Sequence, residues 1–303
     1  MSYIRLSSGS SKSENEALST WLHDPPSLLV SYMFLKDFYK TRSSIGYRDW
    51  VLDSGAFTAW NSGKPIDVYR FMDDVHRMLQ EDKDLPAEIF SLDVIGDPVA
   101  TLKNAVLLRD SGLDVIPTWH AGEPKTYLKE LAATFPKIAV GGMAGGFQVM
   151  TPTRKRAICD EVFNAVWPKL IHGFGVGGPE ALLELPFDSS DASNWAVGPM
   201  AWATWAYWNE WQDKISIPTS HLDLRCEIHY YLKMEALSEL AFRHLLEPLR
   251  QEYRKRPRLQ YKYELKAPAA EPEPVRRKAR ENRPTVLTGK MEDRWVDYWK
   301  NRL

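Results

Sequence analysis

Short apolar runs alternate along this chain with longer segments in which apolar residues recur every three or four positions. The short runs predict strands at residues 28–33, 50–53, 88–93, 115–119, 138–142, 170–176 and 195–198, with a shorter one near 187–191. The helical spacing predicts helices at 66–81, 99–111, 125–135, 154–166 and 179–185. Strands that alternate with helices of this length are typical of parallel βαβ units.

About eight such strands favour an α/β fold of the TIM-like (β/α)8 barrel type, and a doubly wound open sheet is the competing architecture. The polar residues at strand ends separate the two. Asp53, Asp93 and His120 end three different strands, and Asp188 and Asp191 lie near the last ones. The strand ends of a barrel converge on one mouth, whereas an open sheet gathers only those near its switch point. We therefore expect a barrel.

The part of the chain after the barrel divides by pattern and composition. Residues 201–211 carry a tryptophan at every third position, which predicts a helix whose aromatic stripe packs on the barrel or stacks on an extruded base. A long helix is predicted at 222–254, and the Pro- and Ala-rich residues 267–274 read as a linker. We expect a barrel domain at 1–215, a basic helical extension at 216–266, and a linker with a basic tail at 267–303.

Charge is unevenly distributed along the 303 residues, although the formal net charge is only -1. Residues 250–303 hold 16 Lys and Arg against 8 Asp and Glu, whereas residues 1–249 hold 23 against 32. The hydrophobic content of 44% excludes general disorder. The chain has only two cysteines, its first twenty residues are polar, and its apolar runs are too short to span a membrane. We expect a soluble cytoplasmic protein.

The strand ends carry the residues that suggest chemistry. Asp53 is followed by Ser54 and a glycine, and Asp93 ends the next strand, while Asp97 before Pro98 is expected to cap a helix. His120 ends a further strand, close to Glu123. For Asp53 the alternative is a turn or cap, and for His120 it is a structural hydrogen bond.

Two further motifs bring glycine and carboxylates to the same end of the barrel. Gly141, Gly142 and Met143 open a glycine-rich segment that allows a planar ligand to approach the main chain. Asp188 and Asp191 lie three residues apart among serines. Enzymes that act on glycosidic bonds typically use several carboxylates around one pocket. One carboxylate attacks the anomeric carbon, and another carboxyl group transfers a proton. Crowding would move their pKa values apart.

In order and spacing these motifs resemble the tRNA-guanine transglycosylase superfamily. Residues 53–57 are similar to its Asp-Ser-Gly-Gly-Phe signature, Asp93 to its base-recognising Asp, and residues 141–144 to its Gly-Gly-Leu-Ala loop. Residues 175–177 followed by Asp191 resemble its Gly-Val-Gly turn and nucleophilic Asp, which places Asp188 at a preceding, non-nucleophilic position. The family's zinc-binding cysteines are missing, and its Gln-Gly reads His120-Ala121 here. The chain looks more like the DNA-modifying branch, the DpdA-type 7-deazaguanine transglycosylases of phages and bacteria.

The resemblance implies a pentosyltransferase that exchanges guanine in DNA for a 7-deazaguanine, such as preQ0, through a covalent glycosyl-aspartate. Asp191 would be the nucleophile and Asp53 the general acid or base. Asp93, His120, Ser54, Gly141, Gly142 and Met143 would bind the base. No cofactor and no metal are implied, and the cell compartment would be the cytoplasm, that of the host if a phage encodes the chain.

We expect the basic C-terminal residues to bind the nucleic-acid backbone. They are Arg254, Lys255, Arg256, Arg258, Arg276, Arg277 and Lys278. The expected partners are DNA and the free 7-deazaguanine base, and no membrane. A homodimer or partner proteins stay open. The alternatives are a tRNA-guanine transglycosylase, a non-catalytic nucleic-acid-binding scaffold, and a barrel glycoside hydrolase whose tryptophans would stack on sugars.

Overall fold

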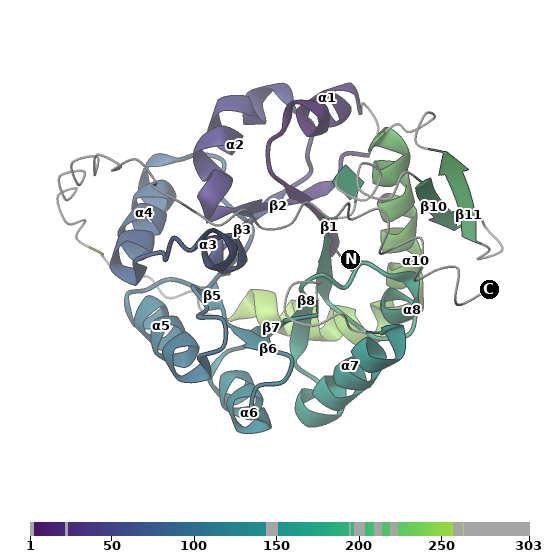
Figure 1. Ribbon diagram of the computed structural model, residues 1–303. Coiled ribbons are helices and arrows are strands. Elements are labelled where there is room, and N and C mark those ends of the chain that lie inside the picture. The colour runs from purple at the N-terminus through teal and green to yellow at the C-terminus, as the bar shows by residue number, and fades with distance from the viewer. Residues whose placement is uncertain are drawn as a thin grey trace, which may run out of the picture. The chain divides into compact units, whose positions relative to one another are not determined.

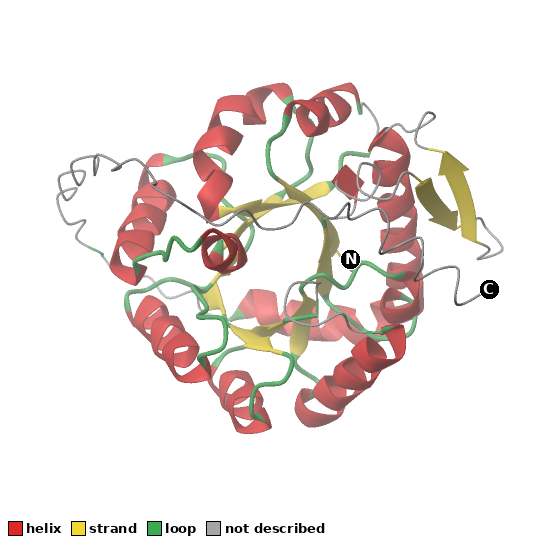
Figure 2. Ribbon diagram, viewed as in Figure 1, coloured by secondary structure: helices red, strands yellow, loops and turns green. Residues whose placement is uncertain are grey.

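A computed structural model describes residues 3–21, 24–143, 151–193, 195–196, 204–208, 214–218, 224–256 and 263. The chain divides into two units, Met1–Leu265 and Lys266–Leu303, of which the second lies outside the described residues. In the first unit, parallel strands form a ring that is surrounded by helices (Figures 1 and 2).

Nine strands of the first unit form one parallel sheet in the order β5-β4-β3-β2-β1-β9-β8-β7-β6. They are β1 (Tyr3–Ser8), β2 (Ser27–Ser31), β3 (Trp50–Asp53), β4 (Ile89–Phe90), β5 (Val115–Ile116), β6 (Thr118–His120), β7 (Lys137–Gly141), β8 (Leu170–Gly173) and β9 (Ser189–Ala192).

The sheet closes through β5 and β6, which are two halves of one strand interrupted at Pro117. Ser91 N–H donates to the carbonyl of Ile116 at 2.9 Å, and Ala139 N–H donates to the carbonyl of Pro117 at 2.8 Å. The interrupted strand therefore bridges β4 and β7, and the predicted TIM-like (β/α)8 barrel is confirmed.

The helices around the barrel match most of the predicted segments. They are α1 (Lys12–Thr20), α2 (Leu35–Thr41), α3 (Ala56–Ser62), α4 (Val68–Glu81), α5 (Pro98–Asp110), α6 (Lys125–Thr134), α7 (Pro152–Val166), α8 (Pro179–Leu182) and α10 (Leu224–Lys255). Asp97 caps α5 as predicted, because its carboxylate accepts a hydrogen bond from Ala100 N–H at 2.9 Å.

Two predicted elements are wrong. Trp195 and Ala196 are helical, so no strand begins at 195, and the missing barrel strand is β1 at the polar N-terminus. In β1 only Ile4 and Leu6 are apolar, because the alternate side chains face the barrel interior. Residues 204–208 do not form a helix either: they form β10 (Thr204–Trp208), which pairs antiparallel with β11 (Lys214–Pro218).

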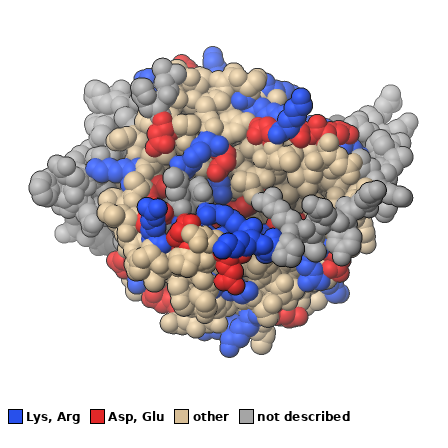
Figure 3. Space-filling view, turned by 180° about the vertical axis from the view of Figure 1, so that it is seen from behind, with Lys and Arg blue, Asp and Glu red and all other residues tan. Residues whose placement is uncertain are grey.

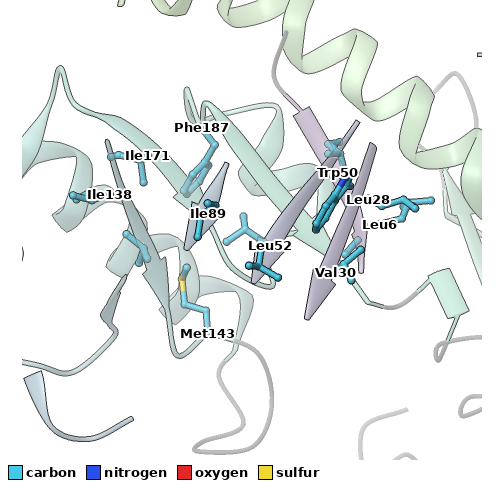
Figure 4. Close-up of a cluster of buried hydrophobic side chains, with 14 of the residues drawn as sticks. Leu6, Leu28, Val30, Trp50, Leu52, Ile89, Ile138, Met143, Ile171 and Phe187 are labelled. Atoms are coloured by element: carbon cyan, nitrogen blue, oxygen red, sulfur yellow. The ribbon is translucent and has the colours of Figure 1, made fainter. Parts of the chain in front are cut away.

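The core has two layers because successive side chains of a strand point to opposite faces. The larger cluster lies between the strands and the helices and includes Leu6, Leu28, Val30, Trp50, Leu52, Ile89 and Ile138 (Figure 4). The smaller one consists of Leu29, Val51, Phe90, Ile116 and Ala139. Along each strand these residues alternate with those of the larger cluster, so the smaller cluster lies inside the barrel. The interior of the barrel is therefore packed with side chains and is not a channel.

The long helix α10 belongs to the barrel unit. It packs against β1, β8, α1 and α8, and Glu235 on α10 accepts a hydrogen bond from the Ile4 N–H of β1 at 2.9 Å. Residues up to 265 fall in the same unit as the barrel, and the domain boundaries drawn from the sequence at 215 and 266 stay a prediction. Within the described residues, no helix is long and apolar enough to cross a membrane.

Candidate active site

A cavity of about 370 Å³ opens at the carboxyl ends of the barrel strands. Figure 1 looks onto this end, with α3 in front of the strands. The cavity walls include most of the predicted site residues: Asp53, Ser54, Asp93, His120, Gly141, Gly142 and Asp191. The carboxyl ends of the strands thus bring together residues that are far apart in the sequence. Asp53 and Asp191, for example, are separated by 138 positions.

Asp191 lies near the end of β9, and its carboxylate is held from two sides. Its Oδ2 accepts a hydrogen bond from the Ser7 hydroxyl of β1 at 2.8 Å, and its Oδ1 accepts one from Gly175 N–H at 2.7 Å. Burial raises the pKa of Asp191, and these two donors act in the opposite direction. The two hydrogen bonds fix the orientation of the carboxylate and leave lone pairs on both oxygens.

Asp53 ends β3 and lies in a more acidic environment. Its Oδ2 accepts a hydrogen bond from Gly55 N–H at 3.1 Å. Burial, together with the negative charges of Asp93 and Asp191, raises the pKa of Asp53 to about 7. A carboxyl group with this pKa can both give and take a proton near neutral pH.

The backbone at Gly55 requires the glycine that follows Asp53 and Ser54. Its backbone is left-handed, with φ of +78°, and a Cβ there would lie 2.9 Å from Met33 Cγ and 3.0 Å from Ser31 Oγ. No larger residue fits without moving these neighbours. The tight turn sets the entry of α3 and keeps the Gly55 N–H directed at the Asp53 carboxylate.

Asp93 is the centre of a hydrogen-bonded chain. Its Oδ1 accepts from the Ser54 hydroxyl at 2.8 Å, and its Oδ2 lies 2.9 Å from His120 Nε2. His120 Nδ1 lies 3.1 Å from Glu123 Oε1. Burial opposes the imidazolium form, but the hydrogen bonds to Asp93 and Glu123 outweigh it and raise the pKa of His120 to about 9.

Both ring nitrogens of His120 face carboxylates, so the protonated ring donates to Asp93 and Glu123. His120 therefore holds Asp93 in place, and its predicted contact with a base stays a prediction.

The glycines at the end of β7 are required by close packing as well as lining the cavity. A Cβ on Gly141 would lie 3.1 Å from His120 Cδ2, and one on Gly142, whose φ is +76°, would lie 3.1 Å from Ala121 N. Met143 is predicted to contact the base through its main chain; its side chain is 1% exposed and packs in the core, with its sulfur 3.7 Å from Cys159 Sγ. Met143 is not among the residues that line the cavity.

Asp188 lies at the opposite, amino end of the barrel, in a buried set of charges that we call the basal ion cluster. Its members are Arg5, Asp49, Glu88, Lys137, Asp188 and Arg250. The Asp188 carboxylate accepts from Lys137 Nζ and from Arg250 Nε, the latter at 2.6 Å. Although burial opposes ionisation, these cations outweigh it and lower the pKa of Asp188. Of these two aspartates, Asp191 lines the cavity and Asp188 does not.

The described basic residues at the end of α10 lie away from the cavity. Arg256 forms an ion pair with Asp114, which directly precedes β5 and so lies at the amino end of the barrel. Arg254 forms an ion pair with Glu247 at 3.2 Å. Figure 3 shows Lys and Arg side chains beside carboxylates on the face seen from behind. Arg258, Arg276, Arg277 and Lys278 lie outside the described residues, and their binding of nucleic acid stays a prediction.

Several cavity residues escaped the sequence reasoning. Ser7 is the most consequential, because it hydrogen-bonds Asp191 from a strand that was not predicted. The alternation of apolar and polar residues in Tyr3–Ser8 is the signal that would have found it. Phe34, Phe57 and Phe174 add aromatic rings to the cavity wall.

Within the described part of the chain, no group of three or more His, Cys, Asp or Glu side chains is arranged to hold a metal ion. In comparisons with known proteins, no protein-family model matches this sequence, and no curated protein matches it significantly.

Proposed function

We propose that this protein is a transglycosylase that exchanges guanine in DNA for a 7-deazaguanine through a covalent glycosyl-aspartate intermediate. The observation that carries the proposal is the differentiation of three carboxyl groups around one cavity. Asp191 is oriented by two hydrogen-bond donors, Asp53 has a pKa of about 7, and Asp93 is fixed by Ser54 and His120. A nucleophile, a proton carrier and a recognition group are the parts that base exchange requires.

In the first step the target nucleotide is extruded, so that its C1′ reaches the cavity. An Asp191 oxygen forms a bond to C1′ as the C1′–N9 bond breaks, and the departing guanine takes a proton from Asp53. Inversion at C1′ gives a glycosyl ester, and guanine diffuses away. Asp53 is left ionised, which prepares it to accept a proton in the return step.

In the second step the 7-deazaguanine enters with a proton on N9. Asp53 takes this proton while N9 attacks C1′, and the ester bond to Asp191 breaks. The second inversion restores the original anomer, so the exchange proceeds with net retention. Asp53 therefore ends one exchange in the same protonation state in which it began.

Asp93 supplies recognition of the base edge. Each of its oxygens accepts one hydrogen bond from the protein and keeps a lone pair for a ligand. The N1–H and exocyclic amino group of guanine and of 7-deazaguanines are a matching pair of donors. The aromatic rings of Phe34, Phe57 and Phe174 offer surfaces on which the flat base can stack.

DNA is proposed as the nucleic acid because the motif order resembles the DNA-modifying branch of the tRNA-guanine transglycosylase superfamily. A tRNA-acting enzyme is the second candidate, favoured by the same carboxylates. A non-catalytic scaffold has no use for carboxylates of this kind beside a polyanion.

The test is mass spectrometry of nucleosides from duplex DNA, and in parallel from tRNA, after incubation with the protein and preQ0. We expect the 7-deazaguanine nucleoside in DNA, its loss in Asp191→Asn, and its retention in the matched control Asp97→Asn, which changes an exposed helix cap. Incorporation only into tRNA would favour the second candidate. The proposal is overturned if neither nucleic acid gains the base or if Asp191→Asn is as active as the wild type.

A further inference from the structure

His172 is a wholly buried histidine beneath the cavity, and one of its nitrogens has no hydrogen-bond partner among the described residues. It lies on β8 and contacts the rings of Phe90 and Phe174, at centroid distances of 4.6 and 4.5 Å, and these two rings also contact each other. Its Nδ1 lies 2.9 Å from Ser189 Oγ. Its Nε2 is buried without a hydrogen bond, 3.8 Å from Asp191 Oδ1. An unsatisfied buried polar atom beside a reactive carboxylate calls for an explanation.

The basal ion cluster favours one of the two neutral tautomers of His172. Lys137 Nζ donates to Ser189 Oγ at 3.2 Å, and an ammonium group has no acceptor to offer in return. The Ser189 hydroxyl can then donate its hydrogen to His172 Nδ1, and we assign the ring proton to Nε2 because a lone pair there would face the Asp191 carboxylate.

The ring is neutral. Burial together with the positive charges of Lys137 and Arg5 lowers the pKa of His172 well below its usual range. A single N–H, on Nε2, thus remains, and it lies on the side of Asp191 Oδ1.

We infer that His172 is a positioning residue for Asp191. The Nε2–H of His172 stabilises the Asp191 carboxylate as that carboxylate leaves C1′. This inference rests on the proposed function. The distance of 3.8 Å exceeds a hydrogen bond in the free protein. Catalytic contacts of this kind are often long in the free protein and shorten only when the reacting complex forms.

The effect falls on the second step of the exchange. There the bond between Asp191 and C1′ breaks, N9 of the 7-deazaguanine bonds to C1′, and its proton passes to Asp53. The electron pair of the broken bond returns to Asp191 and spreads over both oxygens. Charge therefore grows on Oδ1, beside His172 Nε2–H and Gly175 N–H, which act as fixed dipoles next to a buried carboxylate.

In the first step the same carboxylate loses charge. A donor that favours charge on Asp191 therefore does not accelerate the attack on C1′. A role confined to packing would affect both steps alike, so the two rates separate the explanations.

The experiment measures the two steps on labelled, guanine-containing duplex DNA. Without free base, the covalent protein–DNA adduct is trapped in denaturant and its formation rate is measured. Addition of preQ0 then gives the rate at which the adduct is consumed. His172→Phe keeps an aromatic ring in contact with Phe90 and Phe174. In this variant we expect consumption of the adduct to slow by about tenfold, and the rate of its formation to change by less than about threefold.

Three further variants support the assignment. His172→Gln, whose amide can again donate toward Asp191, should recover most of the consumption rate. Ser189→Ala removes the hydroxyl that sets the ring proton and should slow consumption in the same direction, which also decides the matter if His172→Phe fails to fold. His76→Phe, a change at a buried histidine bonded to Ser111 outside the cavity, should behave as the wild type.

Equal slowing of both steps, or unchanged consumption in both His172→Phe and Ser189→Ala, overturns the inference and leaves the proposed function standing. A wild-type protein that forms no adduct and exchanges no base overturns the proposed function, and this inference with it.

Discussion

Replacing Asp53 by Asn should stabilise the protein at neutral and alkaline pH while it abolishes base exchange. The native environment raises the pKa of Asp53 from 3.8 to about 7, chiefly by burial and by the charge of Asp93. A carboxyl group with a raised pKa binds its proton more tightly in the folded state. Its contribution to stability is therefore complete at acidic pH and is lost as the pH rises through about 7.

The size of the effect follows from the shift. About three pKa units at ~1.4 kcal/mol each amount to about 4 kcal/mol in the free energy of unfolding. Because the carboxyl group borders an open cavity, water reduces this figure, and we expect about 2–4 kcal/mol. The amide oxygen of Asn can still accept the hydrogen bond from Gly55 N–H, so the turn that begins α3 is kept.

The assay is urea denaturation of wild type and Asp53→Asn at intervals from pH 4 to pH 8.5. The difference in free energy of unfolding should be near zero at pH 4 and should grow to its full value above pH 7.5. Asp97→Asn is the matched control, and its curve should run parallel to that of the wild type. A constant difference between Asp53→Asn and wild type across this range would refute the pKa argument. Exchange in Asp53→Asn should fall at least about 100-fold, because the amide carries no transferable proton.

Three further outcomes are expected. Asp188→Asn should destabilise the fold by about 3–5 kcal/mol in urea denaturation, because it leaves two buried cations short of an anion, and should leave the exchange rate per folded molecule unchanged. Affinity for preQ0, measured by calorimetry, should fall as the pH rises through about 9, because His120 then loses the proton that holds Asp93, and His120→Gln should remove this dependence. Ser7→Ala should lower the exchange rate about tenfold with little change in melting temperature, since it removes one donor to Asp191.

The barrel could be predicted from the sequence because most strands are apolar on both faces and stand out between amphipathic helices. β1 is the exception: Arg5 and Ser7 face the interior, so half of the strand looks like a polar N-terminus. The tryptophan spacing of three predicts a helix at 201–211, but the described residues 204–208 pair as β10 with β11. The spacing of the tryptophans alone cannot reveal this strand pairing, because the pairing depends on residues further along the chain.

Most of the candidate site could be predicted because it lies at strand ends. Asp53, Asp93 and Asp191 needed only the rule that parallel strands share a carboxyl end. The choice between Asp188 and Asp191 needed the strand bounds: three residues of extended chain, about 10 Å, carry them toward opposite ends of the barrel. The partners of His120 and the hydroxyl of Ser7 come from other strands, and no local pattern records them.

The place of β1 between β2 and β9 has a consequence for folding. The first strand of the chain pairs with the last strand of the barrel, and the hydrogen bond from Ser7 to Asp191 spans 184 residues. During synthesis the cavity therefore stays incomplete until β9 has been made, and β1 must wait with one edge unpaired. Closing so long a loop is slow, so catalytic competence should appear late in refolding and together with ring closure.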